Sequence, residues 1–218
     1  MRIAKGCSYV IRNMLLISLI FFAFGALGNL LSTQLVAFFF LLCGVIFLLF
    51  TILLLFFFRD PDREVGEDIV APADGKIIEI RETHDNEIGE CSFVSIFMNV
   101  FDVHVNRCPI SGRVKKIFYK PGKHLPAFSK KYHDNESNTI LLETNIGLIK
   151  IVQVAGVFAR RIVCYVAEGD EIEKGRRIGI IKFGSRVDLY LPKGKVKILG
   201  SVGLKVKAGV DTIAKIND

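Results

Sequence analysis

Near the C-terminus, a predicted β-strand ends on the peptide bond Gly184-Ser185, and these two residues could together break the chain. A serine hydroxyl can attack the carbonyl carbon of the preceding glycine and move the acyl group from nitrogen to oxygen. β-Elimination of that ester cuts the chain and leaves dehydroalanine, which hydrolyses to a pyruvoyl group. Glycine suits the position before the serine because, without a Cβ, it tolerates strained backbone. Most Gly-Ser pairs are turns, and Gly200-Ser201 is a second pair, so the chemistry needs support from other residues.

Three further positions carry side chains suited to proton transfer or anion binding. Asp74 precedes a glycine after Pro72, a pattern that is most often a tight turn. His104 follows an apolar run, and histidine is the commonest general acid and base, although a packed histidine is an equal alternative. Arg160 and Arg161 follow a Gly-containing bend, and arginine binds phosphate through a rigid fork of donors. A solvated pair of arginines is the alternative there.

A long uncharged segment near the N-terminus predicts a membrane anchor. No charged residue occurs from Asn13 to Phe58, a stretch of 46 positions, whereas one spanning helix needs about 20. Polar and glycine-rich interruptions after position 24 divide it, so we expect spans near 14–31 and 35–58, joined by a short turn. A cleaved signal peptide is the alternative, but its apolar core would be shorter.

The charges that flank this segment predict its orientation. Arg2, Lys5 and Arg12 precede the first span, Arg59 and Arg63 follow the second, and the connecting turn has no charge. The positive-inside rule therefore places both ends of the hairpin on the cytoplasmic side of the cell membrane. We accordingly expect a membrane anchor over residues 1–58 and a cytoplasmic domain over residues 59–218.

The pattern of the soluble part predicts a mainly β domain. Short runs rich in Val, Ile or Phe are bounded by turn residues, and helix is confined to short turns near 99–103 and 125–131. The expected strands are Lys76–Arg81, Cys91–Met98, Gly112–Tyr119, Thr139–Thr144, Leu148–Val154, Arg161–Val166, Arg177–Phe183, Val187–Leu191, Lys195–Leu199 and Asp211–Ile216.

A glycine repeat refines the fold class. Gly169–Gly175 and Gly203–Gly209 share the form G-x-x-h-x-x-G, and each leads into an isoleucine-containing strand. Such repeats are typical of the sandwich barrels of biotinyl and lipoyl carriers, but no lysine lies in a recognisable carrier motif, so the repeat indicates fold and not function. We predict a sandwich-barrel-like domain preceded by a two-helix transmembrane hairpin.

Charge and cysteine content exclude several classes of partner. Residues 59–218 hold 26 Lys and Arg against 22 Asp and Glu, a mild excess that suits an anionic membrane surface. The sequence contains neither a basic helix nor alternating aromatic and basic residues, so it does not indicate nucleic-acid binding. The five cysteines show no CxxC spacing and are odd in number, which favours free thiols over disulfides or a zinc site.

Five ordered motifs resemble the short form of phosphatidylserine decarboxylase, a class that includes archaeal enzymes for archaetidylserine. The motifs are Phe57–Arg63, Ala71–Lys76, Ser95–Pro109, Val152–Val163 and Phe183-Gly184-Ser185 with Val187-Asp188-Leu189. Together they cover residues 57–218. The resemblance implies a lipid-bound decarboxylase that converts a serine phospholipid to the ethanolamine phospholipid.

The resemblance also implies a proenzyme that cuts itself between Gly184 and Ser185. Residues 1–184 would become the β chain and residues 185–218 the α chain of a heterodimer, with a homo-oligomer possible. Ser185 would become the pyruvoyl group, whose ketone would form an imine with the substrate amine. The pair Gly200-Ser201 is similar to the cleavage motif of the long bacterial class, but the Val-Asp-Leu after Ser185 matches the family.

Further site residues follow from the same resemblance. Asp74 matches the aspartate that assists self-cleavage, and His104 matches the first of two histidines, with Arg107 in place of the second. His104 would also reprotonate the substrate carbon. Arg160 and Arg161 are candidates for substrate binding, whereas Asn135-Glu136-Ser137 departs from the usual Asn-Glu-Arg. The pyruvoyl group derived from Ser185 would be the cofactor, and neither a metal nor pyridoxal phosphate would be needed.

Two other classes of function fit part of the sequence. A membrane-tethered sandwich-barrel adaptor would explain the anchor and the repeat, but it gives Ser185 no purpose and predicts an intact chain. A membrane serine protease would use Ser185 as a nucleophile and would retain it as serine.

Overall fold

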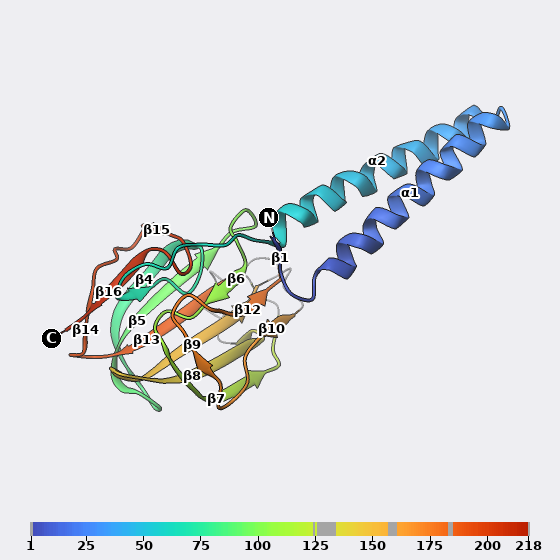
Figure 1. Cartoon of the computed structure of the whole chain (residues 1–218). Helices are drawn as coiled ribbons and strands as arrows, with labels where there is room; N and C mark the ends of the chain where they lie inside the picture. The colour runs from blue at the N-terminus through green and yellow to red at the C-terminus, as the bar shows by residue number, and fades with distance from the viewer. Residues whose placement is uncertain (1, 124, 126–133, 157–160, 183–184, 218) are drawn as a thin grey trace. The chain divides into compact units, whose positions relative to one another are not determined.

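The computed structural model describes residues 2–123, 125, 134–156, 161–182 and 185–217, and the chain separates into two compact units, Met1–Pro61 and Asp62–Asp218. Over residues 2–61, the first unit contains helices α1 (Ser8–Leu30) and α2 (Gln34–Phe57). A short ladder of β1 (Arg2–Ile3) and β2 (Arg59–Asp60) joins its ends (Figure 1). Helix α1 begins six residues earlier than the span expected from residue 14.

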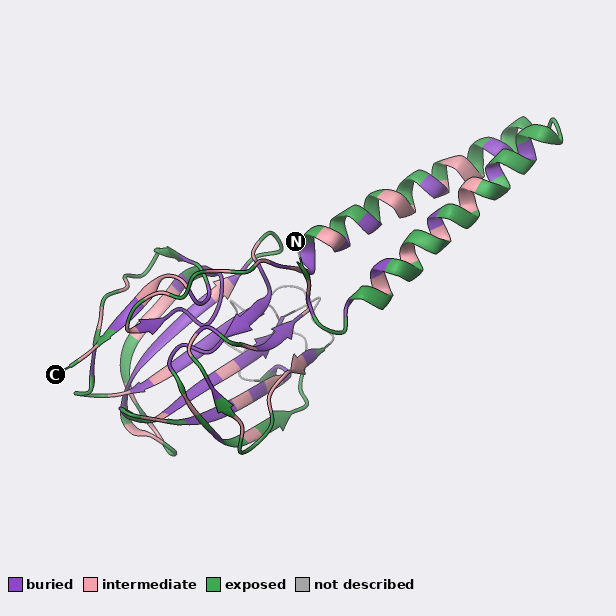
Figure 2. Cartoon of the chain, in the orientation of Figure 1, coloured by how far each residue is buried: buried purple, intermediate pink, exposed green. Residues whose placement is uncertain are grey.

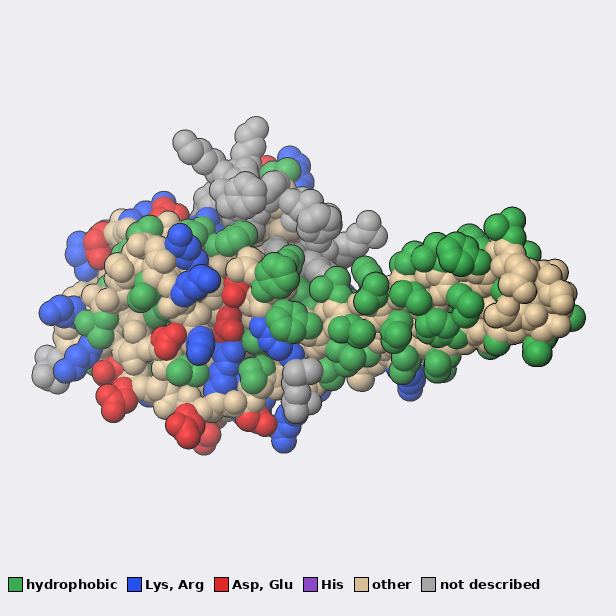
Figure 3. Space-filling view, turned by 90° about the horizontal axis from the view of Figure 1, so that it is seen from above, with side chains coloured by type: hydrophobic (Ala, Val, Ile, Leu, Met, Phe, Trp, Pro, Cys, Tyr) green, Lys and Arg blue, Asp and Glu red, His purple; other side chains and the backbone are tan. Residues whose placement is uncertain are grey.

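The two helices pack through small residues, as helices do in membranes. A Cβ on Gly28 would lie 3.1 Å from the backbone of Ala37, and one on Gly44 would lie 3.0 Å from the ring of Phe22. Ser18 Oγ donates to the carbonyl of Gly44 at 2.9 Å. Both helices are long and apolar enough to cross a membrane, and their outward faces are apolar and exposed (Figures 2 and 3).

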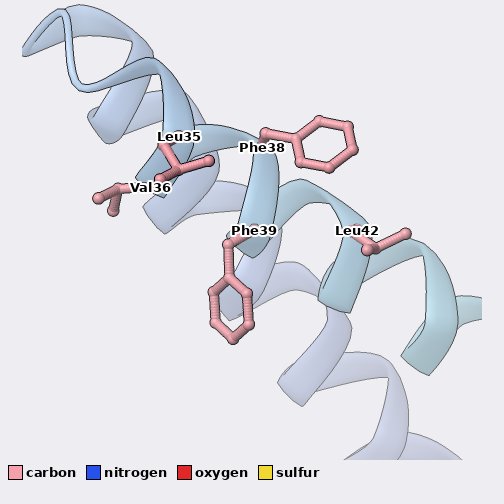
Figure 4. A pocket seen from close by; sticks show the side chains of 5 residues that line it. All are labelled: Leu35, Val36, Phe38, Phe39 and Leu42. Carbon is pink, nitrogen blue, oxygen red and sulfur yellow. The ribbon is translucent and has the colours of Figure 1, made fainter.

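One outward face of α2 is slightly hollowed by large apolar side chains (Figure 4). The hollow is lined by Leu35, Val36, Phe38, Phe39 and Leu42. It contains no group that could bind a polar headgroup or transfer a proton. Contact with lipid tails is the use that its chemistry supports.

Within the described part of the second unit, eight strands form an antiparallel sheet in the order β11-β7-β8-β9-β13-β5-β4-β15. Their bounds are Glu171–Ile172 (β11), Gly112–Lys120 (β7), Ser137–Thr144 (β8), Gly147–Ala155 (β9), Ser185–Pro192 (β13), Gly89–Met98 (β5), Gly75–Asp85 (β4) and Lys205–Val206 (β15). Strand β13 lies at the centre, between β9 and β5.

Two small sheets complete the described strands of this unit, in the orders β10-β12-β6 and β14-β16-β3. Their strands are Ile162–Cys164 (β10), Arg177–Ile181 (β12), Val105–Arg107 (β6), Val196–Ile198 (β14), Thr212–Ile216 (β16) and Ile69–Val70 (β3). Alternate residues of the large sheet, such as Val187, Leu189 and Leu191 on β13, enter one apolar core with residues of the small sheets (Figure 2). The predicted mainly β class, preceded by two apolar helices, is confirmed.

The large sheet curls strongly. Lys150 on β9 forms ion pairs with Asp85 and Glu87 of the β4–β5 hairpin, although two strands separate β9 from β4 in the sheet. Twist accumulates across antiparallel strands, and a contact across that many strands requires the sheet to roll toward a half-barrel. The glycine repeat lies at its two edges: β11 and β15 are the short strands inside the two repeats.

Candidate active site

Ser185 is the first residue of the central strand β13 and is fully buried. Its partners in the sheet are Met98 on β5 and Ala155 on β9. Ser185 Oγ donates a hydrogen bond to Met98 Sδ at 3.2 Å. A thioether is a weak acceptor, so this bond holds the hydroxyl proton weakly. Gly184, the other half of the expected cleavage pair, lies outside the described residues.

The competing serine has a different environment. Ser201 is exposed, in a turn that follows β14, where its carbonyl accepts from Leu204 N at 3.1 Å. The nitrogen of Gly200 donates to the carbonyl of Ile213 at 3.2 Å. This arrangement is that of an ordinary surface turn, and within the described part of the chain no acid or base side chain bonds to Ser201.

His104 lies immediately before β6 and is fully buried. Its Nδ1 lies 2.9 Å from the carbonyl oxygen of Asp102. A carbonyl can only accept, so Nδ1 carries a proton, and in the neutral ring Nε2 is then a proton acceptor. The backbone carbonyl of His104 accepts from Ile181 N at 3.3 Å, at the end of strand β12, four residues before Ser185.

Asp74 is buried and held by three hydrogen bonds. Arg63 contacts both carboxylate oxygens, with Nη2 donating to Oδ2 at 2.8 Å, and Ala208 N donates to Oδ1 at 2.8 Å. Both side chains of this ion pair are 11% exposed. A bidentate pair between arginine and a carboxylate fixes geometry as well as charge. Asp74 is therefore a carboxylate positioned by Arg63 and by the backbone of Ala208.

The glycine that follows Asp74 is required by a close approach of two strands, and not by a tight turn. Gly75 has φ +146°, and a Cβ there would lie 2.1 Å from the carbonyl oxygen of Phe97. Only glycine allows β4 to approach β5 so closely at this point. Lys76 pairs with Phe97, so Gly75 lies beside Met98, which is also the partner of Ser185.

Backbone pairing brings the Asp74 segment alongside the His104 segment. Val70 N donates to Pro109 O and Arg107 N donates to Pro72 O, so residues 70–72 run antiparallel to residues 107–109. Asp74 lies two residues after Pro72, and His104 lies three residues before Arg107. The sheet thus gathers the segments of all three predicted residues around Met98.

A buried chain of amide side chains reaches the same methionine, and sequence reasoning missed it. Asn138 donates to Gln153 at 2.9 Å, and Gln153 donates to Asn106 at 2.7 Å. Asn106 Nδ2 lies 3.7 Å from Met98 Sδ. Every member is buried, and a Cβ on Gly179 would lie 2.8 Å from the amide nitrogen of Gln153. Gly179 is unusual inside an apolar strand. It is the feature of the sequence that could have indicated that another side chain packs against the backbone of β12.

The remaining predicted residues occupy more peripheral positions. Arg107 is buried and donates to the carbonyl of Gly175 at 3.0 Å, which fixes the turn that contains this glycine. Arg161 is exposed just before β10, and Arg160 lies outside the described residues. The expected helical turn near 125–131 also lies mostly outside them.

The segment that departs from the family motif supports the end of β9. Asn135 donates to the carbonyl of Ala155 at 2.8 Å, and the buried Glu136 accepts from Ile162 N at 3.1 Å. Desolvation and then the Glu136 carboxylate raise the pKa of Tyr119, while Arg161 acts in the opposite direction. Glu136, Tyr119 and Arg161 therefore lie close together beyond Ala155, the neighbour of Ser185.

The reverse face of β13 carries charged side chains that point away from Ser185. Arg186 and Asp188 are 3% and 2% exposed, and Arg186 Nε donates to Asp188 Oδ1 at 2.6 Å. Burial raises the pKa of Asp188, whereas Arg186 and the hydroxyl of Ser95 act against that rise. Glu79 on β4 contacts Arg186 at 3.3 Å. Since side chains alternate along a strand, Asp188 is a structural residue and not a partner of Ser185.

Among the described residues, no group of three or more His, Cys, Asp or Glu side chains is arranged to hold a metal ion. The five cysteines are free, and burial raises the pKa of the Cys108 thiol to about 12. The chemistry available here consists of a buried hydroxyl, a buried imidazole and a paired carboxylate. That set suits proton transfer and acyl chemistry on the chain itself.

Comparisons with known proteins define the class. The sequence model of the phosphatidylserine decarboxylase family matches residues 50–214. A phosphatidylserine decarboxylase proenzyme of Desulfotalea psychrophila is 52% identical over 78% of this chain and 83% of its own length. The corresponding proenzyme of Syntrophus aciditrophicus is 51% identical over 73% of this chain and 78% of its own length. A protein of Archaeoglobus fulgidus, provisionally named an archaetidylserine decarboxylase proenzyme, is 44% identical, with coverages of 79% and 83%.

The chain therefore belongs to the phosphatidylserine decarboxylase family, a family of carboxy-lyases, and the three relatives described above are named as proenzymes. The resemblance predicted from the five motifs is confirmed.

Proposed function

We propose that this chain is a proenzyme that cuts itself between Gly184 and Ser185 and then decarboxylates the serine headgroup of a phospholipid. The substrate would be phosphatidylserine or archaetidylserine, and the product the ethanolamine lipid. The observation that carries the proposal is the fully buried Ser185, gathered with the Asp74 and His104 segments around Met98, in a member of this family. Ser201, in an exposed turn, has no such surroundings.

The surroundings of Ser185 fit the group that the family implies. A pyruvoyl group is small and neutral, and Ser185 lies between Met98 and Ala155 with a hydroxyl bonded only weakly to sulfur. Its formation would leave no buried charge without a partner. When present, this group supplies a ketone that accepts the electrons released as CO₂ leaves.

The other residues take roles that their contacts support. His104 would accept and return a proton at Nε2, since Nδ1 is committed to the Asp102 carbonyl. Asp74, oriented by Arg63, would act in self-cleavage. Arg161, exposed beside Glu136 and Tyr119, is the candidate for holding the substrate phosphate, together with Arg160.

The apolar helices support a membrane location for the enzyme. We propose that residues 1–58 anchor the chain in the cell membrane and that residues 59–218 form the catalytic domain on its cytoplasmic side. The support is the length and apolar character of α1 and α2 and the basic residues that flank them. After the cut, residues 1–184 and 185–218 would remain together as a heterodimer of β and α chains.

The intact mass of the purified protein tests the cleavage site. We expect a fragment of about 3.8 kDa for residues 185–218, in proportion to the 24.4 kDa of the whole 218-residue chain. Ser185→Ala should leave the chain uncut, and Ser201→Ala should still be cut. An active preparation made of a single intact chain would refute the proposal, and an inactive intact chain is what an adaptor predicts. A protease would retain an unmodified serine at position 185.

A further inference from the structure

An apolar tip lies between two segments of the candidate site. Residues 99–103 connect Met98 at the end of β5 to His104. Two bonds close this loop: Asn99 N donates to Asp102 Oδ2 and Phe101 N donates to Asn99 Oδ1, both at 2.8 Å. Phe101 is 66% exposed, more than any other large apolar side chain in the described part of the second unit, and Val100 beside it is 44% exposed. Burying these side chains in lipid would remove apolar surface from water.

A second apolar protrusion is the turn that precedes β15. In the turn at 199–204, Val202 is 62% exposed and Leu204 is 44% exposed. The turn is bonded to β4, because Gly203 N donates to Ile77 O at 2.8 Å and Ile77 N donates to Leu204 O at 2.9 Å. Ile77 pairs with Ile96 on β5, two residues before Met98. The tip follows β5 and the turn precedes β15, so both lie near the same end of the sheet, with β4 between these two strands.

Two lysines beside these protrusions have no anionic partner within the described residues. Lys76 on β4 and Lys205 on β15 are exposed and lie directly opposite each other in the antiparallel pair of these strands. Like charges in that relation destabilise a sheet. A negatively charged surface placed against them would remove the repulsion, and each lysine near an anionic bilayer contributes favourably to binding.

The short link between α2 and the second unit also favours a lipid bilayer as the binding partner of this surface. Five residues, 58–62, separate the end of α2 from Arg63, which bonds to Asp74. An extended connection of this length spans about 20 Å. The segment that leads into β4 is thus tied closely to the end of a helix that we place in the membrane.

We propose that Val100, Phe101, Val202 and Leu204, with Lys76 and Lys205, form a docking surface for the anionic face of a lipid bilayer. Docking there would bring the loop that holds His104 to the level of the lipid headgroups. The proposal rests on the proposed insertion of α1 and α2 in the membrane, and it does not require decarboxylase activity.

The absence of tryptophan from the chain allows a direct test. The full chain, reconstituted in vesicles of phosphatidylcholine and phosphatidylglycerol, receives one tryptophan by Phe101→Trp or, in a second variant, Val202→Trp. The control is Asn145→Trp, exposed in the β8–β9 turn at the opposite end of β9 from Ala155. Brominated phosphatidylcholine, which quenches tryptophan in contact with acyl chains, is the probe.

We expect brominated lipid to reduce the emission of the tryptophans at 101 and 202 at least twofold and to leave the control unchanged. Adding Lys76→Glu and Lys205→Glu should relieve that quenching in anionic vesicles but change little in purely neutral ones. Water-like, unquenched emission at both 101 and 202 would overturn the proposal. Blue-shifted but unquenched emission would also overturn it, because protein and not lipid would then cover the surface. Failure of self-cleavage would leave these readings unaffected, so the two proposals can fail separately.

Discussion

Replacing Arg63 with glutamine should both destabilise the second unit and slow its self-cleavage. In the native chain, Arg63 neutralises Asp74 in a pair whose side chains are each 11% exposed. Removing one partner of a buried pair leaves an uncompensated charge and costs about 3–5 kcal/mol. For a unit of this size, 1 kcal/mol shifts Tm by about 2–4 °C, so we expect a decrease on the order of 10 °C. The Ala208 N–H would still donate to Asp74.

The neighbouring residue supplies a matched control. Asp62 pairs with Arg177 at 2.8 Å, but these side chains are 69% and 28% exposed. Exposed pairs contribute about 0–1 kcal/mol, so Asp62→Asn should lower Tm by at most a few degrees and leave cleavage unchanged. Stability is measured by calorimetry in detergent in the Ser185→Ala background, where no variant can cut itself. Cleavage is followed on gels with Ser185 present.

A double variant separates positioning from stability. Arg63→Gln combined with Asp74→Asn removes both charges, so most of the lost stability should return, since the two residues are in contact and their effects are not additive. If Asp74 acts in the reaction, this refolded variant should still cut itself far more slowly than the native chain. A double variant with recovered Tm and normal cleavage would refute the reasoning and make Asp74 a purely structural residue.

Three further predictions concern His104, the buried amide chain and the N-terminal anchor. His104→Ala should slow self-cleavage, CO₂ release or both by about 10²- to 10⁴-fold, the usual contribution of a positioned acid or base; normal rates of both would point to Arg107 instead. Asn106→Leu should lower stability by about 1–3 kcal/mol in urea unfolding, because Gln153 loses its buried partner, and an unchanged midpoint would show that the amide chain is dispensable. Deleting residues 1–56, which keeps Arg63, should leave a domain that cuts itself but releases less CO₂ from vesicles than from a soluble short-chain analogue, since tethering raises the effective concentration at the surface. Deleting residues 1–66 should reproduce the defect of Arg63→Gln; efficient cleavage by the longer deletion would remove Arg63 from the mechanism.

Much of the fold could be predicted because its signals are local. An uncharged segment of 46 residues can only be accommodated by apolar helices, and each of the ten predicted strands overlaps an observed one. Strands β1 and β2, which pair with each other in the first unit, were not predicted. In the second unit, strands β3, β6, β11 and β15 were not predicted. They have two or three residues each, too few to show an alternating pattern, and they form only because longer strands pair with them.

The candidate site was less predictable, because its contacts join distant segments. Asp74-Gly75 read as a turn, whereas the structure shows a close approach of β4 to Phe97. Nothing near Arg63 distinguishes it from other basic residues at a membrane exit, and its pairing with Asp74 depends on the position of Ala208, 134 residues beyond Asp74. Asn106, Gln153 and Asn138 resemble surface residues of strands until two sheets bring their amides together.

The position of Ser185 at the start of β13 also bears on what a cut before it would do. Strand β13 pairs along its whole length, Ser185–Pro192, with β5, and over six of these residues with β9. Val187, Leu189 and Leu191 fill the core on one face, while on the other face Arg186 pairs with Glu79 and with Asp188. A cut before Ser185 frees a chain end and changes Ser185 itself, but it leaves the contacts of residues 186–192 in place. The fragment 185–218 would therefore remain the centre of the sheet, and the new N-terminal group would stay buried beside Met98.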